Sequence, residues 1–182
     1  MTTKRPADQA AAERAVRELL SALGYDADSE RFALTPARVV TALREFTEPA
    51  PLAVSTFPNT DGYDDLVVMR DIAFVSVCEH HLLPFRGVAH VGYLPGEKIA
   101  GLSALAHAVE HYARAATLQE DLTARIADRL QADLGARAVG VVTVAEHQCV
   151  TIRGVRAAGT STLMQAFRGA ERDDAALRRA LS

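Results

Sequence analysis

Two neighbouring helical patterns lie between two groups of strand patterns, and this order constrains the fold more than any other feature of the sequence. Apolar residues recur at helical spacing from Ser103 and again from Thr117 to Leu134, where Gly135 predicts the end of the second helix. β-branched or alternating segments on both sides predict strands, at residues 66–69, 72–77, 88–94, 139–144 and 147–153. We therefore expect an α+β domain whose antiparallel sheet carries its helices on one side.

The amino-terminal part predicts two more helices. Residues 8–23 place apolar side chains three and four positions apart, and Gly24 follows as a stop. Thr35 and Pro36 predict the N-cap and the first turn of a second amphipathic helix. The stretch 48–65 is rich in Pro, Asn, Asp and Gly without periodicity, which predicts a connecting loop.

Length and charge limit the kind of protein and partner. With 182 residues, we expect a single domain over residues 1–182, with a helical part at 1–50 and a core at 66–170. The net charge of −3 offers no basic field to a nucleic-acid backbone. The amino terminus lacks the apolar stretch of a signal peptide, and no segment has the roughly 18 to 20 apolar residues that span a bilayer. We expect a cytoplasmic protein that binds a small molecule or a protein, and neither nucleic acid nor a membrane.

The densest group of chemically capable residues is Cys78-Glu79-His80-His81. Cys78 and His81 lie three positions apart, so a turn can direct both side chains at one ion while His80 points elsewhere. Catalytic zinc has three protein ligands plus a water, so the third ligand comes from a distant segment, and Cys149 is the only other cysteine. The sequence therefore predicts a Zn²⁺ site at Cys78, His81 and Cys149.

The segments around these ligands predict their local structure. Pro84 and Gly87 follow the first group and are typical of a turn. A strand over residues 147–153 places His147, Cys149 and Arg153 on the same face, because side chains alternate along a strand. One face of that strand then presents an imidazole, a thiolate ligand and a guanidinium.

Other interpretations of these residues stay open. A single buried cysteine is more often a small apolar side chain, and a lone histidine is more often a hydrogen-bonded core residue. A purely structural zinc site is a further alternative, although such sites usually have four protein ligands. The combination of Cys-Glu-His-His with a later His-Gln-Cys favours a catalytic metal site, because an apolar core gains nothing from it.

Several separated motifs also occur in an order that matches one known family. They are Cys-Glu-His-His-Leu-Leu-Pro-Phe-Arg-Gly at 78–87, His-Val-Gly-Tyr-Leu-Pro at 90–95, Gly-Leu-Ser at 101–103, Leu-Gln-Glu at 118–120, Glu-His-Gln-Cys at 146–149 and Arg-Gly-Val at 153–155. With these motifs the chain resembles the GTP cyclohydrolase I family over nearly its whole length, including the amino-terminal helix and Thr35-Pro36.

This resemblance implies a fold, an assembly and a reaction. The fold is the tunnelling fold, in which subunits pair antiparallel sheets into a ring, commonly a homodecamer with active sites at subunit interfaces. Zinc is bound by Cys78, His81 and Cys149, and water activated there attacks C8 of the guanine ring of GTP. The imidazole ring opens, formate leaves, and the rearranged ribose closes to give 7,8-dihydroneopterin triphosphate, the entry to folate and other pterins.

The resemblance also assigns roles to individual residues. His80 and His147 match the histidines that move protons at the ring nitrogens and the ribose. Glu120 matches the carboxylate that accepts hydrogen bonds from the guanine amide and amine. Further substrate contacts are implied for Ser103, Gln119 and Arg153. An alternative for Glu120 is structural, because Thr-Leu-Gln-Glu at 117–120 is also a capping-box pattern.

The sequence departs from the family where the triphosphate is held. A lysine normally follows the serine of Gly-Leu-Ser, and an arginine comes three residues after it, whereas Ala104 and His107 occupy these positions here. His107 and His111 could partly replace this charge, although a spacing of four is also typical of a solvated helix face, which we favour. Two alternatives to GTP cyclohydrolase I follow: a diverged paralogue acting on a less phosphorylated guanine nucleotide or nucleoside, and a non-catalytic regulator that binds a purine or pterin.

Overall fold

The computed structural model describes residues 7–169 and 175–181, and the chain forms two compact units, Met1–Glu45 and Phe46–Ser182. The first unit contains α1 (Gln9–Ala22) and all but the last two residues of α2 (Thr35–Thr47). Asp8 caps α1, because its carboxylate accepts a hydrogen bond from the Ala11 N–H at 2.9 Å. Helix α2 begins one residue earlier than predicted, since the Leu34 carbonyl already accepts from the Arg38 N–H.

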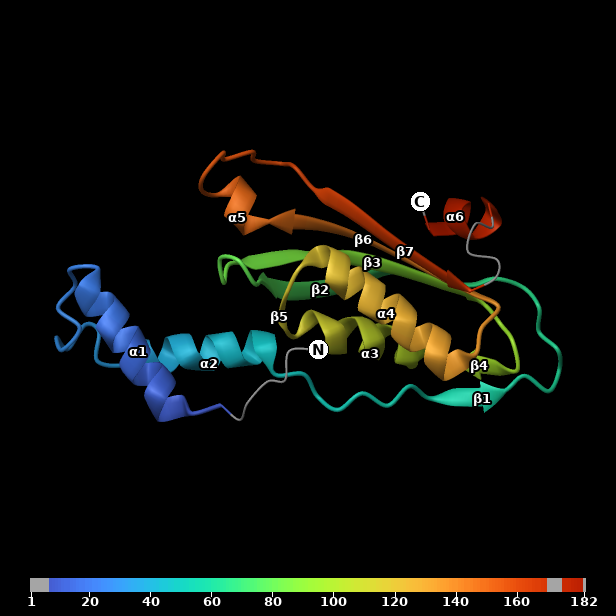
Figure 1. Cartoon of the computed structure of the whole chain (residues 1–182), viewed down its shortest axis with the longest axis horizontal. Coiled ribbons are helices and arrows are strands. Elements are labelled where there is room, and N and C mark those ends of the chain that lie inside the picture. The colour runs from blue at the N-terminus through green and yellow to red at the C-terminus, as the bar shows by residue number, and fades with distance from the viewer. Residues whose placement is uncertain (1–6, 170–174, 182) are drawn as a thin grey trace. The chain divides into compact units, whose positions relative to one another are not determined.

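A five-stranded sheet with the order β5-β2-β3-β6-β7 is the centre of the second unit (Figure 1). Its strands are β2 (Val67–Cys78), β3 (Pro84–Leu94), β5 (Ala116–Thr117), β6 (Ala138–His147) and β7 (Thr162–Gly169). Neighbouring strands are antiparallel, apart from the short parallel pair of β5 with β2. A second small sheet pairs β1 (Thr56–Pro58) with β4 (Lys98–Ala100). The predicted α+β class is confirmed.

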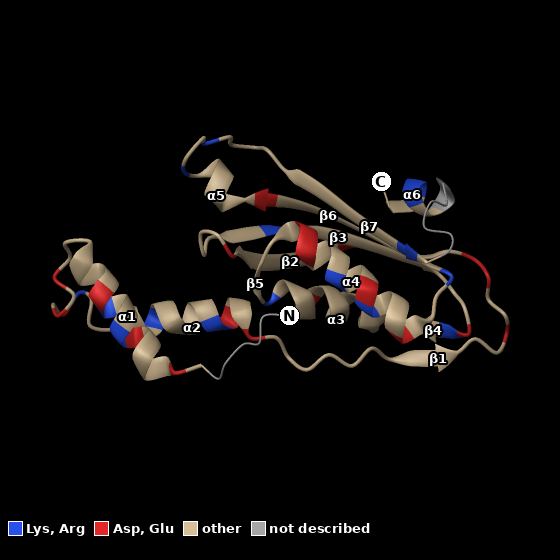
Figure 2. Cartoon of the chain, viewed as in Figure 1, with Lys and Arg blue, Asp and Glu red and all other residues tan. Residues whose placement is uncertain are grey.

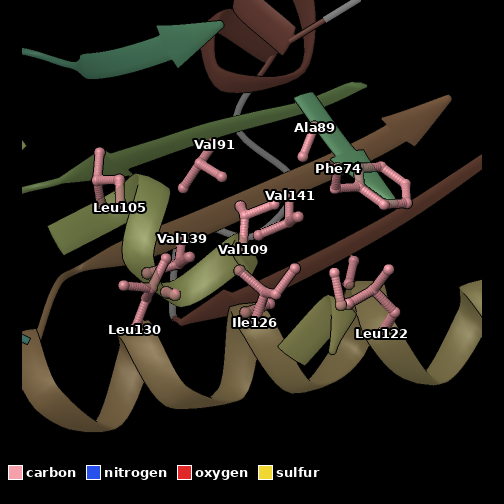
Figure 3. Packing of buried hydrophobic residues seen from close by; sticks show 14 of the residues in the cluster. Phe74, Ala89, Val91, Leu105, Val109, Leu122, Ile126, Leu130, Val139 and Val141 are labelled. Carbon is pink, nitrogen blue, oxygen red and sulfur yellow. The ribbon is translucent and has the colours of Figure 1, made fainter. Parts of the chain in front are cut away.

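The two long helices of this unit, α3 (Leu102–Ala113) and α4 (Gln119–Leu134), form the main core with one face of the sheet. Figure 3 shows how their apolar side chains meet those of the strands, among them Leu105, Val109, Leu122, Ile126, Leu130, Val139 and Val141. Alternate residues of β6 point the other way, where Ala138 and Val142 pack against Leu177 and Leu181 of the short helix α6 (Ala175–Leu181). The major helices therefore share one side, as predicted, and α6 packs on the other.

Two details of the predicted strands were wrong. The segments 66–69 and 72–77 belong to one strand, β2, with an irregularity between Met69 and Ile72, where Asp71 has a φ of 57°. Strand β3 already starts at Pro84, so Pro84 and Gly87 are strand residues. Gly87 is required by close packing, because a Cβ there would lie 1.9 Å from the Val144 carbonyl oxygen.

Three predictions of local structure also need correction. The expected loop 48–65 contains β1, whose three residues end in a proline and show no periodicity. The strand expected at 147–153 is wrong, because β6 ends at His147 and the chain then makes the helical turn α5 (Gln148–Thr151). Strand β7 was not predicted.

Charged residues of both signs are interspersed along the helices, as α4 shows in Figure 2. Within the described residues, no helix combines the length and the apolar character that a membrane span requires.

Candidate metal centre and active site

One end of the sheet brings the predicted chemical residues together. Strand β2 ends at Cys78, and β3 returns antiparallel to it, with Val77 opposite Pro84. Strand β6 ends at His147, directly opposite Phe85 of β3. The parallel pairing of Cys78 with Thr117 in β5 then places the start of α4 at the same end (Figure 1). Segments more than 60 residues apart in sequence are thus joined by strand pairing alone.

A tight turn after β2 directs Cys78 and His81 toward each other. The Cys78 carbonyl accepts hydrogen bonds from the N–H groups of His81 and Leu82, at 3.3 and 2.8 Å, and the Cys78 N–H donates to the Leu83 carbonyl. Leu82 has a φ of 53°, a left-handed conformation that closes the turn at some conformational cost. The result is a distance of 3.7 Å between Cys78 Sγ and His81 Nδ1.

Cys149, on α5, completes the cluster. The ligand atoms of Cys78, His81 and Cys149 all lie within 4.8 Å of one another. Tetrahedral Zn²⁺, with Zn–S near 2.3 Å and Zn–N near 2.0 Å, separates its sulfur and nitrogen ligands by about 3.6 Å, which matches the Cys78–His81 distance. Two thiols and an imidazole are donors that zinc prefers, so this group fits the metal in both chemistry and spacing.

The surroundings of Cys149 disfavour its thiolate form. Burial raises the pKa of the Cys149 thiol, and the neighbouring Cys78 raises it further, while the positive charge of Arg153 opposes both effects. A divalent cation bound by Cys149 would stabilise the thiolate form that these surroundings otherwise disfavour. Cys78 is buried and Cys149 half-buried, whereas His81 is exposed, so the site lies at the surface and is open to a fourth ligand.

His147 lies next to this cluster and is held on two sides. Its imidazole stacks on the ring of Phe85, with centroids 4.7 Å apart and planes inclined by 6°. Its Nε2 lies 2.8 Å from Oε1 of Gln119. Burial lowers the pKa of His147, and the negative charge of Glu120 partly opposes this shift. The neutral imidazole, which can both accept and donate a proton, is therefore favoured.

The Gln119 side chain is buried at the start of α4, with a relative exposure of 1%. Its Nε2 donates to the carbonyls of Thr143 and Thr162, at 3.1 and 3.0 Å, and to the Thr143 hydroxyl at 3.0 Å. The Thr123 hydroxyl donates to the backbone carbonyl of Gln119 at 2.7 Å and lies 2.8 Å from the Thr143 hydroxyl. This network joins α4, β6 and β7.

The remaining predicted site residues differ in where they lie. His80 is exposed and stands edge-on to His81, with ring centroids 6.2 Å apart. Glu120 and Arg153 are exposed, yet each lies near enough to act electrostatically, on His147 and Cys149 respectively. The capping-box alternative for Glu120 is wrong, because the N-cap of α4 is Leu118 and no side chain caps it. Arg153 was predicted to share one strand face with His147 and Cys149. This prediction is wrong, because the segment forms α5 and Arg153 follows it.

Ser103 is not brought to the metal cluster. It is the second residue of α3, and the opposite end of this helix leads into β5, beside Cys78. The ten residues from Ser103 to the end of α3 at Ala113 span about 15 Å at a rise of about 1.5 Å per residue. In a single chain, Ser103 and the cluster are therefore well separated.

The two positions that depart from the family pattern lie on α3. Ala104 is buried, with 1% exposure, whereas His107 is exposed beside a cavity of about 440 Å³ between α3 and the segment around Ala50–Ser55. His111, for which we favoured a solvated helix face, is half-buried, and its Nδ1 lies 2.8 Å from the Ala50 carbonyl oxygen. In this pair Nδ1–H donates and the carbonyl accepts.

Sequence reasoning missed two residues that shape the site. Phe85 was read only as part of a motif, although its position opposite His147 makes it the base on which the imidazole rests. Thr143 lies in the β-branched run that predicted a strand, and no role was assigned to it. Thr143 is polar and lies four residues before His147, which places both side chains on the same face of β6. This was the signal from which its role could have been predicted.

Comparison with known proteins identifies the family of this chain. The family model of GTP cyclohydrolase I matches residues 12–182. The chain belongs to the GTP cyclohydrolase I family. GTP cyclohydrolase 1 of Streptomyces coelicolor is 49% identical over 182 residues, which is 96% of this chain and 90% of that protein. GTP cyclohydrolase 1 of Mycobacteroides abscessus is 48% identical over 178 residues, covering 94% and 86% of the two chains.

A solved structure described as the archaeosine synthase QueF-Like in the apo form is also similar. It has 18% sequence identity and a TM-score of 0.49, and the match covers 59% of this chain and 96% of that one. The membership in the GTP cyclohydrolase I family confirms the resemblance that the motifs indicated, and with it the tunnelling fold.

Proposed function

We propose that this chain is a GTP cyclohydrolase I, which opens the imidazole ring of GTP at C8 by hydrolysis, releases formate and forms 7,8-dihydroneopterin triphosphate. The observation that carries the proposal is the Cys78, His81 and Cys149 cluster beside a neutral, oriented His147, in a chain that matches the family from residue 12 to its end. A metal site with three ligands that is open to a fourth, next to a proton carrier, is the arrangement that hydrolysis requires.

In this proposal Cys78, His81 and Cys149 hold Zn²⁺. When bound there, zinc supplies Lewis acidity that activates water near neutral pH. His147 and the exposed His80 move protons between water, the guanine ring nitrogens and the ribose.

The charged residues around the cluster bind the nucleotide. The Glu120 carboxylate accepts hydrogen bonds from the guanine amide and amine, which selects guanine over adenine, since adenine lacks that pair of donors. Arg153 places a positive charge beside the cluster and attracts the anionic substrate.

We further propose that the active enzyme is a homo-oligomer, in line with the decamer implied by the family resemblance, with residues of two subunits at each site. Ser103 lies about the length of α3 away from the cluster of its own chain, so we assign it to a neighbouring site. Large apolar side chains are also exposed in the segments that frame the cluster, among them Val75, Leu82, Ile152, Val155 and Leu163. Their burial between subunits removes apolar area from water.

The proposed metal site also bears on the compartment. Cys78 and Cys149 are free thiols that must stay reduced to bind zinc. A reducing compartment satisfies this requirement, so we place the enzyme in the cytoplasm.

The deciding experiment is formate release by zinc-loaded protein with GTP, GDP, GMP and guanosine in parallel, together with fluorescence of the oxidised pterin. We expect turnover with GTP at the highest kcat/KM. Preference for a less phosphorylated substrate would contradict GTP as the substrate and would trace to Ala104 and His107. Release of formate from none of the four would contradict the proposed function.

A further inference from the structure

Gln119 has the motif position of a substrate-binding residue, but its side chain is already fully engaged inside the protein. The amide nitrogen Nε2 is surrounded by three acceptors, two of which are the backbone carbonyls of Thr143 and Thr162. A carbonyl oxygen can only accept, so the nitrogen of the amide must face these groups. The amide oxygen Oε1 must then face His147.

This orientation determines which ring nitrogen of His147 carries hydrogen. An amide oxygen accepts and does not donate, so the 2.8 Å contact between Oε1 of Gln119 and Nε2 of His147 requires a hydrogen on Nε2. In the neutral imidazole the lone pair is then on Nδ1. The parallel ring of Phe85 fixes the plane of the imidazole, and the contact with Oε1 of Gln119 fixes which ring atom faces the amide.

We propose that Gln119 is a positioning residue for the hydrolytic reaction: it holds His147 in the tautomer with hydrogen on Nε2 and thereby makes Nδ1 the nitrogen available for proton transfer with the substrate. The inference rests on the proposed function, and it gives Gln119 a role through His147 in place of a direct contact with the nucleotide. The backbone carbonyls of Thr143 and Thr162, which can only accept, fix the direction of the side-chain amide.

The geometry of α4 and β6 makes this arrangement specific. Gln119 is the first residue of α4, and the short β5 pairing fixes that end of the helix beside Cys78. Thr143 lies on β6 four residues before His147, so one strand supplies two of the three acceptors that orient the amide and also the imidazole that the amide orients. A shift of the helix end would release both groups together.

The first test needs no substitution. NMR of zinc-loaded wild-type protein with isotope-labelled histidine distinguishes protonated from unprotonated ring nitrogens, and comparison with His147→Ala assigns the signals of His147. We expect hydrogen on Nε2 and none on Nδ1 at a pH where the ring is neutral. The opposite tautomer would overturn the proposal.

The second test compares Gln119→Met with Thr123→Val. The methionine keeps the volume of the side chain but removes the acceptor for His147. The valine removes a hydroxyl from the same buried network and leaves the four hydrogen bonds of the Gln119 amide intact. Both variants lose buried hydrogen bonds. If the role of Gln119 were only structural, the loss of activity in each variant would follow its loss in the free energy of unfolding.

We expect Gln119→Met to give mixed His147 tautomers and a kcat that is roughly 10- to 100-fold lower, by analogy with the loss seen when the hydrogen-bond partner of a metal-ligating histidine is removed. Its KM for GTP should change little, and Thr123→Val should keep the tautomer and kcat of the wild type. A raised KM with unchanged kcat for Gln119→Met would overturn the proposal, because it indicates direct substrate binding. Absence of formate release by the wild type contradicts the proposed function, whereas the tautomer of His147 is measured independently of turnover.

Discussion

The imidazole of His147 lies flat against the phenyl ring of Phe85, with ring centroids 4.7 Å apart and planes inclined by only 6°. The two residues are direct partners in the register of β6 and β3. Phe85 is fully buried and meets Phe74 edge-on at 6.1 Å, so the imidazole rests on the apolar core. The same contact excludes water from one face of His147, which agrees with burial as the main cause of its lowered pKa.

This stacking predicts a specific loss of activity in Phe85→Leu. The substitution removes the planar support of His147 and aromatic contacts that stabilise the fold by roughly 0.5–1.5 kcal/mol. We expect a lower free energy of unfolding in urea, retained zinc and a lower kcat for formate release. The matched control is Phe74→Leu, which disturbs the same core but does not contact the His147 ring. Equal losses of kcat in both variants would show that the stacking on His147 has no functional role.

Substitutions should distinguish the proposed metal ligands from the proposed proton carrier. In Cys149→Ala only Cys78 and His81 remain, so we expect the purified variant to lose tightly bound zinc and turnover together. In His147→Ala the cluster is intact, so zinc should stay at wild-type stoichiometry while turnover falls. Metal analysis and formate release, measured on the same preparations, check both expectations. Full zinc content in Cys149→Ala would refute the proposed ligand set.

The sequence predicted the residues of the metal cluster better than the structure that assembles it. Cys78, His81 and Cys149 could be chosen because thiolate and imidazole are rare together and the chain has only two cysteines. The path of the chain near Cys149 was predicted wrongly, since alternation at 147–153 indicated a strand and the segment forms a helical turn. In a segment this short, tertiary contacts with the neighbouring strand ends override the local pattern.

Other features depended on distant pairing, which one sequence does not reveal. The role of Thr143 follows from its position opposite α4, 24 residues from Gln119, and not from any local pattern. Strand β7 shows little alternation in burial because it lies at the edge of the sheet, so its sequence gives a weak periodic signal. The long helices α3 and α4 were predicted correctly, because their apolar residues recur over several turns.

Gly87 should tolerate substitution poorly. In Gly87→Ala the new Cβ would lie 1.9 Å from the Val144 carbonyl oxygen and 2.7 Å from Ala145 Cα, so β3 and β6 must move apart next to His147. We expect a loss of roughly 1–3 kcal/mol in the free energy of unfolding, as for overpacked interiors. Gly101→Ala is the control, since its Cβ meets no atom closer than 3.5 Å. Equal stability of the two variants in urea would contradict the close approach of β3 and β6.

The phenol of Tyr93 should make stability depend on pH above the physiological range. Tyr93 is fully buried, and its oxygen accepts a hydrogen bond from the Ala100 N–H at 2.9 Å. Tyr93→Phe leaves this buried N–H without its acceptor, so we expect a loss of roughly 1–3 kcal/mol in the free energy of unfolding near neutral pH. Tyr25→Phe, at an exposed tyrosine, should change stability little.

The pH dependence follows from the direction of the shift. Burial raises the pKa of Tyr93 above its ordinary value of 10.0, so the folded protein keeps the phenol proton when the unfolded chain has lost it. The stability that the neutral phenol contributes is therefore complete below about pH 10 and is lost as the pH rises toward the higher folded pKa. Urea unfolding at pH values from about 8 to 11 should show the advantage of wild type over Tyr93→Phe shrinking above about pH 10. An advantage that stays constant over this range would contradict the raised pKa.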